Sequence, residues 1–178
     1  MELSIGQKVC YPNQGICLIE DIEKKTVGGT KMRFYALRVL SDDSIILVPT
    51  DNAEVIGVRP IISNKECKSL WDELESDFEP VSGDWKTRSR QFTQKLQSGD
   101  VFEAADVLKK LTFLSHEKKL SFREQSLLEK AKFLIVSEIC SVHKDRKDEI
   151  QIDSQVVDRV ECACTKHLRS NGNSTSDH

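Results

Sequence analysis

The spacing at which apolar residues recur changes once along the chain, and this change constrains the fold more than any other feature. Up to about residue 58, short apolar runs rich in β-branched residues alternate with turn-forming residues, which is typical of strands. From Ser63 onward, apolar residues recur every three or four positions, which predicts amphipathic helices. We therefore expect an α+β protein with a β domain over residues 1–58 and a helical domain over 59–168.

Turn signals divide the first half into four or five short strands. A first turn falls in "YPNQG" at 11–15, and Gly28-Gly29 predicts a two-residue hairpin turn, because both positions of such a turn need the backbone freedom of glycine. A third turn precedes the apolar run 45–49, "IILVP". So many short strands in about 55 residues predict a small, strongly bent sheet or β-barrel.

Helix-start signals recur through the second half. Ser63 and Glu66 have the spacing of a capping box, in which each side chain bonds the backbone N–H of the other residue. Further starts are expected at Asp84, Asp100 and Ser121, and a last, weaker helix at Asp153. The apolar stripes of these helices include Leu70, Leu74, Phe92, Leu96, Leu108, Leu111, Leu134 and Ile135. This half is thus predicted to be an all-α helical bundle.

The chain ends give no sign of export. The start, "MELSIGQKV", lacks the charged and apolar regions of a signal peptide, and no window approaches about 18 consecutive apolar residues. We expect a soluble cytoplasmic protein whose six cysteines are reduced. Residues 169–178 are polar and are predicted to be a disordered tail.

Net charge argues against a protein that coats nucleic acid through bulk charge, because the chain carries −3 and has a pI of about 5.9. Residues 81–144 alone have a basic excess, with 12 Lys and Arg against 8 Asp and Glu. Either one face of this region contacts phosphate, or its helices carry ordinary surface charge. The composition leaves both interpretations open.

The segment "VSGDWKTRSR" at 81–90 places Trp85 at the start of a predicted helix. Three cations follow within five residues: Lys86, Arg88 and Arg90. On a helix, Arg88 flanks the tryptophan on one side and the other two cations flank it on the opposite side. This pattern fits an aromatic wedge into stacked bases, with the cations on phosphates. The alternative is that Trp85 continues the apolar stripe of its helix and packs in the core.

Signatures of enzymes and of metal sites are weak. The sequence has no Gly-rich phosphate loop, no G-x-S-x-G and no H-E-x-x-H, so we expect a non-catalytic protein without a cofactor. Cys162, Cys164 and His167, joined by Cys140, offer zinc-type ligands and leave metal or thiol sensing as an alternative. Residues two apart point to different faces of a helix, however. We therefore expect no metal site, and we expect the thiols to pack as small apolar groups.

Two parts of the chain resemble a known family. The segments "IGQKVCYPNQGICLIEDIE" and "LVPTDNAEVIGVRPII" resemble the Tudor-like RNA-polymerase-interacting domain that the CarD/CdnL family of bacterial transcription regulators shares with the transcription-repair coupling factor. The segments "VSGDWKTRSRQFTQKLQSGD" and "LLEKAKFLIVSEI" resemble the C-terminal domain of the same family. The resemblance covers roughly residues 3–142 in the family's order. It implies a Tudor-like β-barrel followed by the helical bundle.

For the first half, the resemblance implies docking on the β subunit of RNA polymerase by strand addition. The hairpin residues Lys25, Thr26 and Val27 correspond to residues that face the polymerase in the family. Leu47 stands where relatives often carry an arginine, so the contact here is expected to be more apolar or weaker.

For the second half, the resemblance implies that Trp85 enters the minor groove of double-stranded promoter DNA at the upstream edge of the transcription bubble. Lys86, Arg88 and Arg90 would then be phosphate contacts. The implied activity is sequence-independent stabilisation of the promoter open complex by a nucleoid-associated protein that needs no dimer. A rival hypothesis is an interaction adaptor that acts through the β domain while Trp85 stays buried.

Overall fold

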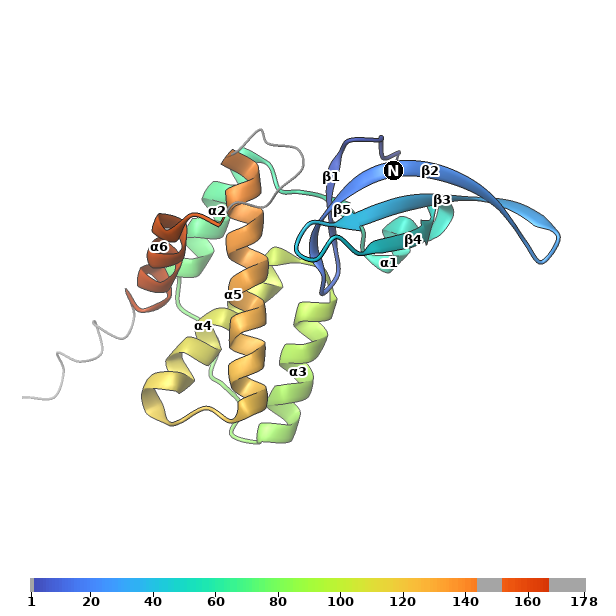
Figure 1. Ribbon diagram of the computed structural model, residues 1–178. Helices are drawn as coiled ribbons and strands as arrows, with labels where there is room; N and C mark the ends of the chain where they lie inside the picture. Colours follow the sequence, from blue (N-terminus) through green and yellow to red (C-terminus); the bar gives the residue numbers. More distant parts are fainter. Residues whose placement is uncertain (1, 144–151, 167–178) are drawn as a thin grey trace, which may run out of the picture.

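The N-terminal part of the chain forms one antiparallel sheet in a computed structural model that describes residues 2–143 and 152–166 (Figure 1). The strands are β1 (Lys8–Tyr11), β2 (Gly15–Val27), β3 (Thr30–Val39), β4 (Ile45–Pro49) and β5 (Arg59–Pro60). Their order in the sheet is β4-β3-β2-β1-β5. A 3₁₀ turn (Thr50–Asn52) and the short helix α1 (Ala53–Ile56) connect β4 to β5. We call β1–β5, with this connection, the β module.

The long β2–β3 hairpin has the turn that the sequence predicts. Val27 pairs with Thr30, which leaves Gly28 and Gly29 as the two turn residues. Both have positive φ, 57° and 81°, as a type I′ turn requires. A register shift between Ile19 and Asp21 increases the bend of the hairpin, which projects away from the helices (Figure 1).

The second half contains the predicted helices α2 (Asn64–Glu75), α3 (Trp85–Gln97), α4 (Val101–Glu117), α5 (Phe122–His143) and α6 (Ser154–Cys164). Both bonds of the Ser63–Glu66 capping box form. Asp84, Asp100 and Asp153 each accept a backbone N–H from the first turn of their helix. The predicted class, a β fold followed by a helical bundle, is therefore confirmed. We call α2–α6 the helical module.

Each module has its own cluster of buried apolar residues. The cluster of the β module includes Val9, Cys17, Ile19, Leu37, Val39 and Val48. The cluster of the helical module includes Leu70, Leu74, Phe92, Leu111, Ile135 and Val160. The chain passes from one cluster to the other between Val58 and Ile62. The domain boundary at residue 58 stays a prediction, since β5 extends the sheet to Pro60.

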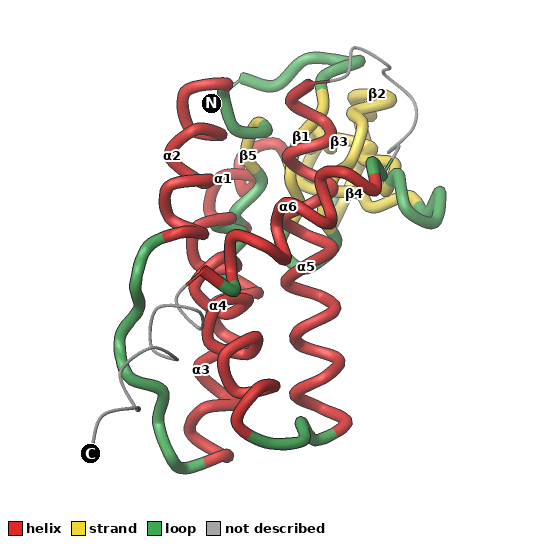
Figure 2. Tube along the Cα trace, turned by 90° about the vertical axis from the view of Figure 1, so that its left-hand side faces the viewer, coloured by secondary structure: helices red, strands yellow, loops and turns green. Residues whose placement is uncertain are grey.

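Helix α5 lies at the centre of the helical module, with α3 on one side and α2 and α6 on the other (Figure 1). Figure 2 shows the strands gathered at one end of the helices. The last helix, α6, packs on α2, α4 and α5 and buries Val160 completely. Within the described residues, no helix has the length and apolar character needed to cross a membrane. The predicted tail over 169–178 lies outside these residues.

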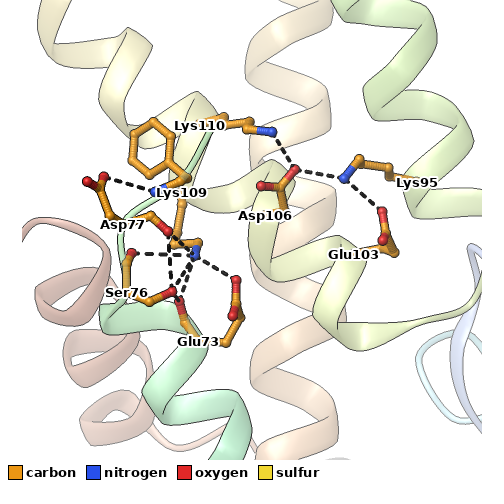
Figure 3. Close-up of polar contacts among 9 residues, drawn as sticks. Glu73, Ser76, Asp77, Lys95, Glu103, Asp106, Lys109 and Lys110 are labelled. Carbon is orange, nitrogen blue, oxygen red and sulfur yellow. Dashed lines mark hydrogen bonds and ion pairs between the residues drawn. The ribbon is translucent and has the colours of Figure 1, made fainter. Parts of the chain in front are cut away.

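A buried lysine on α4 holds the end of α2 (Figure 3). Lys109 is only 1% exposed, and its Nζ donates to the carbonyl oxygen of Glu73 at 2.7 Å, to Glu73 Oε1 at 2.8 Å and to Ser76 Oγ at 3.1 Å. The last carbonyls of a helix have no partner within the helix. Lys109 supplies that partner and thereby fixes where the segment leading to Trp85 leaves α2.

A second cluster of charges, also drawn in Figure 3, joins α3 to α4. Asp106 accepts bonds from Lys95 at 2.9 Å and from Lys110 at 2.8 Å, and Lys95 also pairs with Glu103. Burial alone would raise the pKa of Asp106, but the bonds from Lys110 and Lys95 outweigh it and lower this pKa below its ordinary value. Asp106 therefore remains ionised at neutral pH between two lysines.

The two neighbouring lysines of α4 allow a matched test. Lys109→Met should lower the free energy of unfolding by about 1–3 kcal/mol, because buried acceptors at the end of α2 lose their donor. Lys110→Met should cost less than about 1 kcal/mol, because Lys95 still pairs with Asp106. Urea unfolding measures both, and equal losses would contradict the role given to Lys109.

Candidate nucleic-acid interface

Trp85 is the first residue of α3, and 61% of it is exposed. The side chain of Asp84 accepts the N–H of Thr87 at 3.1 Å and so fixes the start of the helix directly before the tryptophan. The indole lies in the first turn and does not continue the buried stripe to which Phe92 belongs. The alternative of a core Trp85 is therefore wrong.

A cation lies beside this indole. The Nζ of Lys86 is 5.7 Å from the centroid of the Trp85 ring, within the range of a cation–π interaction. The chain's other tryptophan, Trp71, is partly buried on α2 and lies under the guanidinium of Arg159 at 4.1 Å. Of the two indoles, only Trp85 presents most of its surface to a partner.

Arg88 does not face outward with the other cations, and its predicted phosphate contact is wrong. It is 4% exposed, and its guanidinium donates to Glu124 Oε1 from Nη2 at 2.5 Å and from Nε at 3.2 Å. Its Nη1 donates to the carbonyl oxygen of Ser82 at 2.8 Å. Arg88 therefore ties the start of α3 to α5 and to the segment before Trp85, and its charge is neutralised inside the bundle.

Glu124 accepts bonds from several directions. Burial would raise its pKa, but bonds from the backbone and side chain of Ser121 and from Arg88, together with the charge of Lys118, lower the pKa to about 2. The bonds between Ser121 and Glu124 also form the capping box at the start of α5. One carboxylate thus starts α5 and anchors α3.

Arg123, which no sequence pattern singled out, is an exposed cation that lines the same surface as Trp85. From α5 it reaches across to α3, where its Nε donates to Ser89 Oγ at 2.6 Å and its Nη2 to Thr93 Oγ1 at 3.2 Å. Its distance along the chain from Trp85 hid this relation. The only sequence signal was its place in the basic region 81–144.

These side chains form a shallow groove between α3 and the start of α5, which we call the basic groove. It is lined by Trp85, Lys86, Ser89, Arg90, Thr93, Gln94, Gln97 and Arg123. Among these described residues, three are cations and none is a carboxylate. The groove has the charge of a surface that binds phosphates, with an exposed aromatic ring at one end.

A second large aromatic residue is exposed near the basic groove. Phe122, the first residue of α5, is 93% exposed and directly precedes Arg123. Helices α3 and α5 both start at the end of the helical module away from the sheet (Figure 1). The apolar stripes of the sequence gave no reason to single out Phe122, because it lies outside them.

The residues expected to face the polymerase lie on two parts of the β module. Lys25, Thr26 and Val27 are exposed near the hairpin tip, where Lys25 also pairs with Glu23 at 2.9 Å. Leu47 lies on β4 and is 39% exposed. Lys25 pairs with Met32 across the hairpin, whereas Leu47 pairs with Ala36. Met32 and Ala36 are four residues apart on β3, so about 13 Å along that strand separates the positions of Lys25 and Leu47.

Strand β4 forms an edge of the sheet, since it pairs only with β3 among the described residues. Ile45, which is 52% exposed, lies two positions before Leu47 and so on the same face of the strand. The edge therefore combines open backbone groups with two exposed apolar side chains. Of these two residues, the family resemblance had implied a role only for Leu47.

Three of the four candidate ligands of the metal alternative lie within the described residues. Cys140 and Cys164 are buried in the helical module, Cys162 is exposed, and His167 lies outside the described residues. Burial raises the pKa of Cys164 to about 12, which favours a neutral thiol over the thiolate that binds metals. No group of three metal-binding side chains occurs within residues 2–143 and 152–166.

The depressed pKa of Glu124 predicts a loss of stability in acid. A carboxylate with a folded pKa near 2 stabilises the fold above its unfolded pKa of about 4.3. This contribution, on the order of 3 kcal/mol, is lost as the pH falls from about 5 to 2. Glu124→Gln should remove this part of the pH dependence of urea unfolding, whereas the exposed Glu129→Gln should keep it. Equal pH profiles for Glu124→Gln and the unchanged protein would refute the assignment.

Comparison with known proteins identifies both modules. Residues 3–62 match the model of the CarD-like/TRCF RID domain, and residues 69–153 match that of the CarD C-terminal domain. YdeB of Bacillus subtilis (strain 168), which is named as a transcription factor, is 30% identical over 139 residues, or 76% of this chain and 88% of YdeB. The solution NMR structure of the 72-residue N-terminal domain of Myxococcus xanthus CarD is 39% identical and covers 33% of this chain and 79% of that one, with a TM-score of 0.30.

The two domain models match in consecutive order, and YdeB aligns over most of its own length. The chain extends beyond the second model, which ends at residue 153, by the helix α6. The chain belongs to the CarD family of transcription factors, which interact with RNA polymerase.

Proposed function

We propose that the protein holds the β subunit of RNA polymerase through its β module and binds promoter DNA through the basic groove, thereby stabilising the open complex. It does so without catalysis. The observation that carries the proposal is the exposed Trp85 at the end of a groove lined by three cations and no carboxylate among the described residues. Such a surface can bind a nucleic-acid backbone and also insert a ring between bases.

The contacts divide into two kinds. Lys86, Arg90 and Arg123 neutralise phosphates, which fixes the position of the duplex without reading its sequence. Trp85 then enters the minor groove at the upstream edge of the bubble, where a ring that unstacks a base step opposes reannealing. Arg88 supports this arrangement from inside the bundle and makes no DNA contact in it.

The polymerase contact uses the open edge of β4. An extended segment of the polymerase adds a strand there, so that backbone hydrogen bonds supply much of the affinity. Ile45 and Leu47 give this edge an apolar character, and Lys25, Thr26 and Val27 contact the polymerase from the hairpin. The Leu47 position then favours an apolar partner surface.

Tethering explains how a chain with a net charge of −3 can act on DNA. Docking on the polymerase makes DNA binding effectively intramolecular, so a small basic groove suffices. A gain of about 1.4 kcal/mol at the bubble edge already lengthens the lifetime of the open complex roughly tenfold. One protein molecule per polymerase is enough for this action.

The lifetime of the open complex under a heparin challenge tests the proposed role of Trp85. The unchanged protein should prolong it roughly tenfold, and Trp85→Ala should lose most of that gain while its affinity for polymerase stays the same. Trp85→Phe, which keeps an aromatic ring, is the matched control and should retain part of the gain. If Trp85→Ala prolongs the lifetime as well as the unchanged protein, the wedge is refuted and the adaptor hypothesis takes its place.

The salt dependence of DNA binding tests the phosphate contacts separately. Arg90→Gln and Arg123→Gln should each reduce the slope of log affinity against log salt by about 1, because each removes one phosphate contact. Lys68→Gln, which alters an exposed cation on α2, is the control and should leave the slope unchanged. A slope that Arg123→Gln does not change would remove Arg123 from the interface.

A further inference from the structure

A buried carboxylate on α5 joins the two modules. Glu138 is 1% exposed and accepts bonds from Arg59 Nη1 at 2.6 Å and from Nη2 at 2.9 Å. It also accepts the backbone N–H of Ile62 at 3.0 Å. A guanidinium that binds both oxygens of a carboxylate has a defined orientation, because two parallel hydrogen bonds must form together. The pair therefore fixes both the distance and the relative orientation of β5 and α5 where they meet.

Arg59 reaches a third part of the fold. It lies in β5, where it pairs with Cys10 of β1. Its Nε donates to the carbonyl oxygen of Gly99, between α3 and α4, at 2.9 Å. One side chain thus joins the sheet to α5 and to the end of α3, the helix that begins with Trp85.

Close backbone packing surrounds this pair. A Cβ atom on Gly57 would lie 2.9 Å from Cγ of Pro12, and one on Gly99 would lie 3.1 Å from the same atom. A Cβ atom on Gly15 would lie 3.3 Å from Cε1 of Phe133 on α5. The turn between β1 and β2 is thus packed closely against the helical module.

The Arg59 guanidinium remains charged at neutral pH. Burial alone would lower the pKa of Arg59, but its bonds to Glu138 raise this pKa above the ordinary value. Burial, together with the charge of Glu138, raises the pKa of the neighbouring Cys10 thiol well above its ordinary value. A neutral thiol, rather than a second anion, therefore lies next to the ion pair.

We propose that Arg59 and Glu138 are positioning residues that lock the β module and the helical module into one rigid body. The lock sets where Trp85 stands relative to a polymerase held by the β module. Neither residue belongs to the basic groove or to the β4 edge. Loss of the pair should therefore leave DNA binding and polymerase binding intact, each measured alone, and should weaken only their combined effect. This last consequence rests on the proposed function.

¹⁵N relaxation of the full chain tests the lock without DNA or polymerase. In the unchanged protein, both modules should show one rotational correlation time. In Arg59→Gln, the two modules should show different correlation times, because independent motion separates them. The matched control is Arg38→Gln, which breaks the pairs of Arg38 with Glu20 and Asp43 inside the β module. It should keep a single correlation time.

A second variant keeps the test decisive if Arg59→Gln does not fold. Glu138→Gln retains an acceptor for the N–H of Ile62 but loses the ionic bond to Arg59, and it should also separate the correlation times. A single correlation time in every folded variant of the pair would overturn the lock.

The open-complex lifetime tests the functional consequence. Whichever variant folds, Arg59→Gln or Glu138→Gln, should lose most of the roughly tenfold gain in open-complex lifetime. The reason is that coupling between two tethered sites depends on their geometry. Its separate affinities for polymerase and for DNA should equal those of Arg38→Gln. A normal lifetime despite separated correlation times would overturn the positioning role. If the unchanged protein gives no gain, the proposed function fails, while the relaxation result still decides whether the lock exists.

Discussion

The ion pair between Arg88 and Glu124 determines which side chains remain available at the candidate interface. It holds the first turn of α3 against the first turn of α5, and it also holds the carbonyl oxygen of Ser82 just before Trp85. The start of α3 is thus bound to α5 and to the preceding segment, and in this position Trp85 points outward instead of into the bundle. Breaking such a pair on one side leaves a buried charge unpaired, which typically costs about 3–5 kcal/mol. The charges that hold the start of α3 below the exposed indole are therefore buried inside the bundle.

The fold was largely predictable because its signals are local. Gly28 and Gly29 define the hairpin turn, and the capping box of Ser63 and Glu66 marks the first long helix. Asp153 marked α6 even though its apolar stripe is weak. What lay beyond prediction depends on residues distant in sequence, such as the contact of Arg59 with Glu138. The pairing of β5 with β1 likewise carries the sheet past residue 58, in a strand too short to leave a periodic pattern.

The candidate interface was only partly predictable, for a related reason. Spacing on one helix shows which face a residue occupies, so Trp85, Lys86 and Arg90 could be grouped from the sequence. Spacing does not show which partner another helix supplies, so the burial of Arg88 by Glu124 was not foreseen. The same limit hid Arg123, which comes from α5 and takes the third cationic place in the basic groove. The structure therefore places Arg123 in the groove and Arg88 inside the bundle.

The two edges of the sheet differ in a way that limits self-association. Strand β5 has only two residues, one of them Pro60, which has no N–H to donate, and its Arg59 is bound to the helical module. Of the two end strands in the described sheet, β4 is thus the one that can pair with the backbone of another chain. Two copies that paired through β4 would occupy the same backbone groups that a polymerase strand would use. Homodimerisation by this route and docking on polymerase would therefore exclude each other.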